Sequence, residues 1–297
     1  MNAMRSAAFP AVCLAVGLAL GGCKSGGGAP VDAAGGGDGP NAGCPSNPED
    51  LISDFESDNA LAPAGGRQGG WYTYGDDVGA FDRPATGFNI DTGNPNCSPE
   101  GALHIKGTGF AMWGAATGVD WKPRPTDGDG GYGAKMTYDA SAYRGIAFWA
   151  KADKVLDGVQ VGFPDLYTDH LAPNHDMPDP VDASMFLCMD CVCEYAPGFP
   201  NNCSPYLVQF GKKGDAAADV VFSGYSGVQL DTTWKRFQVL FVDAKQDPGN
   251  GGYHTSTDRL DVAHLTAMAI QINADYSTGL PQANNFEIWI DDVSFIR

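Results

Sequence analysis

The sequence predicts an all-β protein that folds as a single antiparallel β-sandwich of the jelly-roll type. Three observations carry this prediction. Apolar residues almost never recur with the spacing of a helical face. Short stretches rich in β-branched and aromatic residues follow one another between clusters of Gly, Pro, Asn and Asp. No stretch between them has the pattern of a crossover helix, so neighbouring strands are expected to pair antiparallel.

Ten segments have the composition of strands, and several of them alternate between apolar and polar residues. In the segment Gly158–Tyr167, Val159, Val161 and Phe163 fall on one face. In the segment Thr233–Val242, Arg236 and Gln238 fall on the face opposite to the apolar residues. The expected strands are Leu51–Glu56, Gly70–Tyr74, Ala102–Phe110, Ala134–Asp139, Gly145–Ala152, Gly158–Tyr167, Tyr206–Lys212, Thr233–Val242, Leu265–Asn273 and Glu287–Phe295.

Three stretches rich in Gly, Asp and Pro are expected to be loops. Loops of their length are either functional or held in place by cross-links. They are Asp76–Glu100, Pro123–Gly131 and Ala172–Pro205.

The first 22 residues have the pattern of a secretory signal peptide. Arg5 supplies a positive charge, and Ala7–Leu20 is apolar but shorter than the roughly 20 residues that span a membrane. Leu-Gly-Gly-Cys at 20–23 resembles the lipobox of bacterial lipoproteins, which implies cleavage before Cys23 and acylation of its thiol. The alternative is an ordinary signal peptide followed by an incidental cysteine. Position 24 is Lys rather than Asp, which favours an anchor in the outer membrane or at the cell surface.

A segment without large apolar side chains follows the lipobox. Such a composition cannot bury enough surface to order itself, so residues 24–43 are expected to form a flexible tether. We therefore assign 1–22 to a signal peptide, 23–44 to the lipidated cysteine and tether, and 45–297 to one domain. About 250 residues suffice for one large core. A monomer is expected.

The chain is strongly acidic. It holds 36 Asp and Glu against 18 Lys and Arg, a formal net charge of −18. This balance argues against nucleic acid or anionic lipid as a partner, so the lipid anchor is the only membrane contact expected. It also supplies carboxylates for divalent cations.

Six cysteines lie beyond the lipobox, and in an exported protein they are expected to form disulfides. The sequence does not fix their pairing, although their clustering suggests Cys44 with Cys97. A thiolate metal site in the dense cluster is the alternative. The six are Cys44, Cys97, Cys188, Cys191, Cys193 and Cys203.

The last expected strand holds two adjacent carboxylates, Asp291 and Asp292, among apolar residues. Neighbours in a strand point to opposite faces, so at least one of them should point inward. A buried carboxylate requires a compensating partner. Main-chain N–H groups at the strand end are one possible partner, and a cation is the other.

The ordered motifs from residue 50 to residue 297 resemble carbohydrate-binding modules with a galactose-binding-like jelly roll. They are similar to cellulose- and glucan-binding modules and to lipoprotein domains of soil bacteria such as myxobacteria. The motifs are ISDFESD, GGWYTYGDD, ALHIKGTGF, YRGIAFWAKA, TTWKRFQVLFVD, LTAMAIQINA and IWIDDVSF.

The resemblance implies a polysaccharide partner of the β-glucan type and a structural calcium ion that joins the first and last strands. In such modules a Glu and an Asp commonly hold the ion, which correspond to Glu56 and Asp291. Asp54, Asp292 and Glu100 are further ligand candidates. Calcium suits this donor set because it binds six to eight oxygens from carboxylates and carbonyls.

The sequence lacks the patterns of common catalytic sites. It has no Glu-x-Asp-x-x-Glu run of a β-sandwich hydrolase, no Gly-x-Ser-x-Gly elbow and no histidine-based zinc motif. We therefore do not expect an enzyme.

Aromatic residues favour sugar binding, because flat rings pack against the apolar faces of pyranoses while polar side chains bind hydroxyls. Trp149, Trp234 and Trp289 lie in apolar strands and are expected in the core. The residues expected to bind carbohydrate are Trp71, Tyr74, Asp77, Trp113, Asp165, Tyr167, Gln238 and Gln271.

The function expected from the sequence is that of a surface lipoprotein whose calcium-stabilised β-sandwich binds polysaccharide without catalysis. Two alternatives remain open: a structural or adhesive envelope protein that binds protein, and a diverged glycan-active hydrolase.

Overall fold

The computed structural model describes most of the domain between residue 44 and the C-terminus. All described residues belong to one unit of the chain, Gly36–Arg297. The described residues are 44–56, 60–82, 88–94, 97, 101–125, 134–156, 158–166, 168–169, 206–209, 224–225, 229–245, 259–275, 280 and 282–297.

Several residues singled out in the sequence lie outside the described part of the chain. Among them are the expected signal peptide and most of the tether. The individual residues are Cys23, Glu100, Tyr167, Cys188, Cys191, Cys193 and Cys203.

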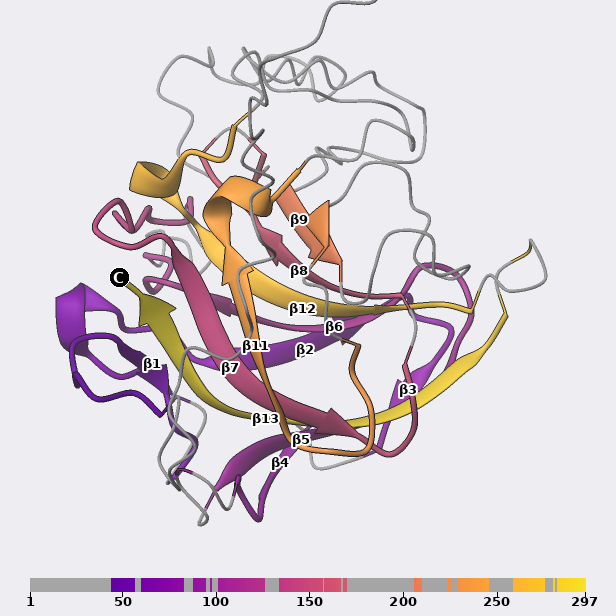
Figure 1. Cartoon of the computed structure of the whole chain (residues 1–297). Helices are drawn as coiled ribbons and strands as arrows, with labels where there is room; N and C mark the ends of the chain where they lie inside the picture. The colour runs from indigo at the N-terminus through magenta and orange to yellow at the C-terminus, as the bar shows by residue number, and fades with distance from the viewer. Residues whose placement is uncertain are drawn as a thin grey trace, which may run out of the picture. The chain divides into compact units, whose positions relative to one another are not determined.

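The described strands form two sheets that face each other. The first sheet has the order β11-β7-β13-β5-β3, with β1 on β13 and β4 on β5, and the second has the order β10-β9-β8-β12-β6-β2 (Figure 1). The strands are β1 Leu51–Ser53, β2 Trp71–Gly75, β3 Ala80–Phe81, β4 Phe88–Asp91, β5 Ala102–Phe110, β6 Gly114–Asp120, β7 Gly145–Ala152, β8 Val159–Phe163, β9 Tyr206–Gln209, β10 Gly224–Tyr225, β11 Lys235–Leu240, β12 Ala267–Asn273 and β13 Asn284–Ile296.

Antiparallel pairing dominates both sheets. β13 pairs antiparallel with β5 and with β7, and β12 pairs antiparallel with β6 and with β8. The short pair β9 and β10 is parallel. The predicted antiparallel β-sandwich is therefore confirmed.

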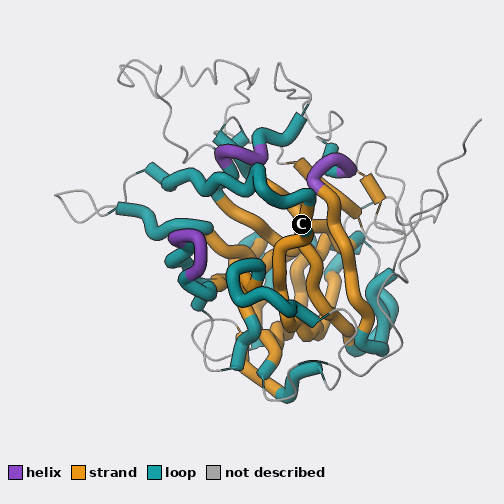
Figure 2. Tube along the Cα trace, turned by 60° about the vertical axis from the view of Figure 1, so that its left-hand side comes forward, coloured by secondary structure: helices purple, strands orange, loops and turns teal. Residues whose placement is uncertain are grey.

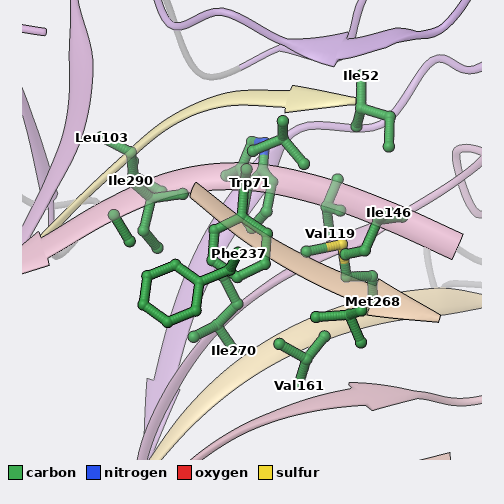
Figure 3. Packing of buried hydrophobic residues seen from close by; sticks show 14 of the residues in the cluster. Ile52, Trp71, Leu103, Val119, Ile146, Val161, Phe237, Met268, Ile270 and Ile290 are labelled. Atoms are coloured by element: carbon green, nitrogen blue, oxygen red, sulfur yellow. The ribbon is translucent and has the colours of Figure 1, made fainter. Parts of the chain in front are cut away.

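The core fills the space between the two sheets (Figure 3). Leu103 and Ile290 come from the first sheet, and Val161 and Ile270 come from the second; each is at most 1% exposed. Alternate residues along each of these strands point outward, so the sandwich has two outer faces.

Two expected strands, Ala102–Phe110 and Gly145–Ala152, match β5 and β7 at both ends. The expected loop Asp76–Glu100 contains two short strands, β3 and β4. The expected strand Ala134–Asp139 is wrong, because this segment makes only an isolated bridge at Tyr138.

The inner strand β6 was missed entirely by the sequence prediction. Its residues, Gly-Ala-Ala-Thr-Gly-Val-Asp, include five that are poor strand formers on propensity alone. Their small side chains fit this position because β6 lies between β2 and β12.

The helices of the described part are three single turns of 3-10 helix at the periphery of the sheets (Figure 2). They are Ala64–Gly66, Phe241–Asp243 and Val262–His264. None of the helices in the described ranges has the length and apolar character needed to cross a membrane.

A fully buried arginine fastens the N-terminal segment to the sandwich. The Arg67 guanidinium donates to the main-chain oxygens of Glu49, Leu51 and Ala62 and to the hydroxyl of Tyr138, at 2.6 to 3.3 Å. Because the planar guanidinium has donors in fixed directions, one side chain satisfies four acceptors at once.

Candidate functional site

Three partly exposed aromatic side chains form a strip along the edge of the second sheet. Tyr72 and Tyr74 alternate with the buried Trp71 on β2, so both tyrosines point to the outer face. Trp113 stands on the turn between β5 and β6. The ring centroids lie 5.8 Å apart for Tyr72 and Tyr74, and 5.9 Å apart for Tyr74 and Trp113. Their exposed fractions are 37, 41 and 37%.

Small residues lie beside the strip on the neighbouring strands. Tyr72 pairs with Gly118 of β6, which in turn pairs with Ala269 of β12, and Ala269 pairs with Gly162 of β8. A Cβ atom at Gly118 would lie 3.5 Å from Cζ of Tyr72. The tyrosine ring therefore leans over β6 where no side chain stands in its way.

Neutral amide side chains occupy the next row of the same face. In this row Tyr74 is followed across the sheet by Ala116, Gln271 and Gln160. The amide nitrogens of Gln271 and Gln160 both donate to Oδ1 of Asn273, at 2.7 and 3.4 Å. Gln271 is partly exposed and Gln160 is 7% exposed, so Gln271 is the amide of this pair that faces solvent, without net charge.

A charged network closes one end of the strip. The hydroxyl of Tyr72 donates to Oδ1 of Asp120 at 3.0 Å, and Nζ of Lys135 lies 2.8 Å from the same oxygen. Lys135 also lies 3.1 Å from Oδ2 of Asp169, which accepts a hydrogen bond from Thr266. Each acid is therefore paired with the same lysine.

The environment of the two tyrosines keeps their hydroxyls protonated. Burial and then the Asp120 carboxylate raise the pKa of Tyr72. The same two causes, in the same order, raise the pKa of Tyr74 to about 12. At neutral pH both phenols therefore act as neutral groups that can donate and accept hydrogen bonds.

Of the expected carbohydrate-binding residues, Tyr74, Trp113 and Gln271 come together on this face. Asp77 is exposed in the turn that follows β2, with φ of 61°. Tyr72, Gln160 and Asn273 were not among the expected residues. Alternation in the Trp-Tyr-Thr-Tyr run already placed Tyr72 on the face of Tyr74, and that signal could have found it.

Three of the expected positions are corrected by the structure. Trp71 is 2% exposed and lies among core side chains (Figure 3). Its indole packs on Phe55. Asp165 is fully buried and accepts hydrogen bonds from Thr168 and from the main-chain N–H of Asp261. Gln238 is exposed on β11 of the first sheet, so it does not share a face with Gln271 of the second.

The prediction that Trp149, Trp234 and Trp289 are core residues is also wrong, because all three are partly exposed. Trp289 stacks on His104 at 4.4 Å, and Nζ of Lys151 lies 4.6 Å from its centroid. These contacts pair residues of adjacent strands on the outer face of the first sheet. Neighbouring side chains thus cover the ring faces that a sugar would need.

A second cluster surrounds the adjacent carboxylates of β13. Asp291 and Asp292 are both buried, 0 and 4% exposed, although neighbours in a regular strand point to opposite faces. Asp291 is opposite Trp149, and Ser294 is opposite Ala147, so β13 holds one extra residue there. This bulge, with φ of 48° at Asp292, brings both acids inside.

The neighbouring carboxylates of this cluster influence the pKa of Asp291. Burial, opposed by the N–H groups of Asn94 and Asp292 but reinforced by the charges of Asp292 and Glu56, raises the pKa of Asp291 to about 8. Oδ2 of Asp291 accepts from Asn94 at 2.7 Å, and Oδ1 accepts from Asp292 at 2.8 Å. Of the two possible partners, main-chain N–H groups are therefore present for Asp291, and the charges of Asp292 and Glu56 act on the same carboxyl group.

The turn that carries Glu56 is tightly packed. Phe55 has φ of 57°, and a Cβ atom at Gly101 would lie 2.0 Å from its carbonyl oxygen. The main-chain N–H of Glu56 donates to Oδ1 of Asp54 at 3.4 Å. Every side-chain atom of this cluster that could bind a metal is an oxygen, and calcium prefers oxygen ligands. Across the described ranges, no group of three or more His, Cys, Asp or Glu side chains is arranged to hold a metal ion.

The predicted disulfide between Cys44 and Cys97 is confirmed, with 5.5 Å between the Cα atoms. Both cysteines line a cavity of about 490 Å³ together with Asp54 and Asp292. The disulfide therefore borders the carboxylate cluster.

No protein-family model and no curated protein matches this chain. The chain is similar to the solved family 11 carbohydrate-binding module of Clostridium thermocellum in complex with a β-1,3-1,4-mixed-linked tetrasaccharide. The identity is 10% and the TM-score 0.43, over 83% of this chain and 94% of that one.

Two further solved structures are similar at a lower score. The family 30 carbohydrate-binding module of a cellulosomal cellulase of Clostridium thermocellum has 12% identity and a TM-score of 0.36, over 76% of this chain and 90% of that one. An agarase has 8% identity and a TM-score of 0.35, over 82% of this chain and 26% of its own. At these values the ligand of this chain has to be inferred from its own residues.

Proposed function

We propose that this chain binds polysaccharide, without catalysis, on the outer face of its second sheet. The observation that carries the proposal is the strip of Tyr72, Tyr74 and Trp113 beside the amides of Gln271 and Gln160. Aromatic faces pack on the C–H faces of sugar rings, and neutral amides exchange hydrogen bonds with hydroxyls.

The angles within the strip favour a single glycan chain over a flat crystalline surface, and the resemblance of the sequence motifs to glucan-binding modules favours the β-glucan type. The planes of Tyr72 and Tyr74 are tilted by 37°, and those of Tyr74 and Trp113 by 41°. Rings tilted in this way cannot all lie flat on one plane of packed chains. Successive sugars of one twisted chain can each meet a differently tilted ring.

The acids at the end of the strip support binding over hydrolysis. A hydrolase needs one carboxylic acid that donates a proton and a second carboxylate at a defined separation. Asp120 and Asp169 both face Lys135, at 2.8 and 3.1 Å, so one ammonium group engages both carboxylates in ion pairs.

A structural calcium ion would bind at this cluster through Glu56, Asp291 and Asp292, with Asp54 as a further candidate. The described carboxylates are not already arranged around one metal position, so the ion would have to draw them together on binding. The buried position of Asp291 and Asp292 and the raised pKa of Asp291 support this part of the proposal. Main-chain carbonyls or water would complete the coordination. A bound cation would offset the repulsion among these acids and so stabilise the contact between β1 and β13.

We also propose that the domain is displayed on the outer membrane or cell surface. Cys23 would carry the lipid, and residues 24–43 would separate the domain from the membrane. The resemblance of residues 20–23 to a lipobox supports this location. A monomer is sufficient, because the strip, the amides and the charged network all belong to one chain.

The binding proposal is tested by titration calorimetry with soluble mixed-linked β-glucan, xyloglucan and chitin oligosaccharides. Tyr74→Ala and Trp113→Ala should each weaken binding about tenfold, the loss expected for one aromatic contact. Trp234→Ala, on the other outer face, is the control and should bind like the wild type. Equal affinity for all three variants, or no binding of any glycan by the wild type, contradicts the proposal. Release of reducing sugar would instead support the hydrolase alternative.

A further inference from the structure

A buried carboxylate lies directly beneath one end of the aromatic strip. Asp76 follows β2 and is 6% exposed. Its Oδ1 accepts the main-chain N–H groups of Val78 and Gly79, at 3.1 and 3.2 Å. Its Oδ2 accepts those of Met112 and Gly114, at 2.7 and 3.3 Å.

The two oxygens therefore accept hydrogen bonds from two different turns. Oδ1 organises the turn that follows Tyr74 in the chain. Oδ2 organises the turn between β5 and β6, and its two donors, Met112 and Gly114, flank Trp113 on either side. The main-chain N–H of Asp76 adds a third tie to this second turn by donating to the carbonyl of Gly114 at 3.1 Å.

We propose that Asp76 is the positioning residue that holds Trp113 beside Tyr74 and thereby completes the binding strip. The role in binding rests on the function proposed above, whereas the positioning of Trp113 does not. Trp113 is partly exposed and its exposed neighbour Met112 is on the same turn, so ring packing alone does not fix this turn. The main-chain oxygen of Trp113 accepts a hydrogen bond from Ala274 at 3.2 Å, and the Asp76 carboxylate fixes the turn on both sides of Trp113, at Met112 and Gly114.

The charge state of Asp76 suits this task. Burial opposes ionisation, but the four N–H donors outweigh it and lower the pKa of Asp76 below the usual carboxyl value. The group is therefore a carboxylate at neutral pH. Two acceptor oxygens are then available, one for each turn.

Replacement of Asp76 by asparagine turns one of the two acceptor oxygens into an NH₂ group and keeps the shape of the side chain. The amide has one acceptor oxygen and one NH₂ group, which can only donate. In either orientation the NH₂ group faces the N–H donors of one turn. Asp76→Asn should therefore release one of the two turns. Asp77→Asn is the matched control, because it changes the next residue, which is exposed, in the same way.

The first experiment follows Trp113 itself and needs no ligand. The full chain is labelled with 5-fluorotryptophan, and the fluorine resonance of Trp113 is identified by its loss in Trp113→Phe. Asp76→Ala removes both acceptor oxygens and should shift or broaden this resonance, while that of Trp289 on the opposite sheet stays in place. Asp76→Asn should do the same only where its NH₂ group faces Met112 and Gly114. An unchanged Trp113 resonance in a folded Asp76→Ala variant overturns the proposal. If Asp76→Ala does not fold, Asp76→Asn and Asp76→Ser are both measured, and an unchanged Trp113 resonance in both overturns it.

The second experiment is a double-mutant cycle on affinity for soluble mixed-linked β-glucan. Asp76→Ala should weaken binding about as much as Trp113→Ala, and it should cost nothing further when added to Trp113→Ala. Equal losses in both backgrounds overturn the positioning role. If the wild type binds no glycan, the proposed function fails, and the fluorine measurement still decides whether Asp76 positions Trp113.

Discussion

The main-chain N–H of Asn94 donates to Oδ2 of Asp291 at 2.7 Å, and so joins two residues that are 197 positions apart in the chain. Asn94 follows β4, and Asp291 begins the bulge of β13. The bond is buried, and it stabilises the ionised form of Asp291 against burial and the charges nearby. The stability of the domain in the absence of a cation should therefore depend on this one carboxyl group.

Raising the pH should destabilise the metal-free protein. The folded pKa of Asp291 is about 8, above the ordinary carboxyl value of 3.8, so the folded state binds a proton more tightly than the unfolded state. Stability should fall as the pH rises from about 4 towards 8. Melting temperatures in EDTA at pH 5 and pH 8 measure this effect. Asp291→Asn should show a smaller drop, and an equal drop in both proteins would contradict the assignment.

Calcium should raise the melting temperature at pH 7.5, and EDTA should lower it. The cation would offset the repulsion among buried acids, and by linkage a ligand of the folded state stabilises in proportion to its saturation. Glu56→Gln should weaken the response, whereas Asp77→Asn, which removes an exposed acid, should not. A wild-type melting temperature that is insensitive to both additions would exclude the ion.

Replacing Arg67 by lysine should destabilise the fold by about 3 kcal/mol. The guanidinium donates to four acceptors, and an ammonium at the end of a flexible stem cannot reach all of them, which leaves buried carbonyls without donors. Urea unfolding measures the change. Arg297→Lys, at an exposed salt bridge to Asp50, should cost much less. Similar losses in the two variants would show that burial of Arg67 is not important.

Substitutions at Gly118 should change glycan affinity in proportion to side-chain size. A Cβ atom there would lie 3.2 Å from the carbonyl oxygen of Met268 and 3.5 Å from the ring of Tyr72. Gly118→Ala should therefore be tolerated, while Gly118→Leu should push the Tyr72 ring away from β6 and weaken binding at least tenfold. The series is read by calorimetry, with the circular dichroism spectrum as a control for folding. Wild-type affinity in Gly118→Leu would exclude Tyr72 from the binding strip.

The sequence predicted the outline of the fold because the strands that face the core alternate clearly. It did not predict β6, because Gly and Ala have weak strand propensity and the strand depends on its two neighbours for stability. It also could not show that Asp291 and Asp292 point the same way, because a bulge is set by pairing between distant strands.

The candidate site was predicted in part for a related reason. Alternation separates Tyr74 from Trp71, but only tertiary structure shows which face is core. Gln238 and Gln271 look equivalent in the sequence, and the assignment of their strands to different sheets is a property of topology. Asp76 was passed over because hydrogen bonds to main-chain N–H groups leave no pattern in the residue sequence.

When the chain is pulled from its N-terminal side, the disulfide between Cys44 and Cys97 determines which part of the domain bears the force. β1 has only three residues, Leu51–Ser53, and a pull on the chain before Cys44 would otherwise peel this strand from β13 one hydrogen bond at a time. With the cross-link in place, the pull passes at Cys44 into Cys97 and the segment that follows β4. A domain held by its N-terminal end can thus resist drag on a bound polymer without losing its first strand.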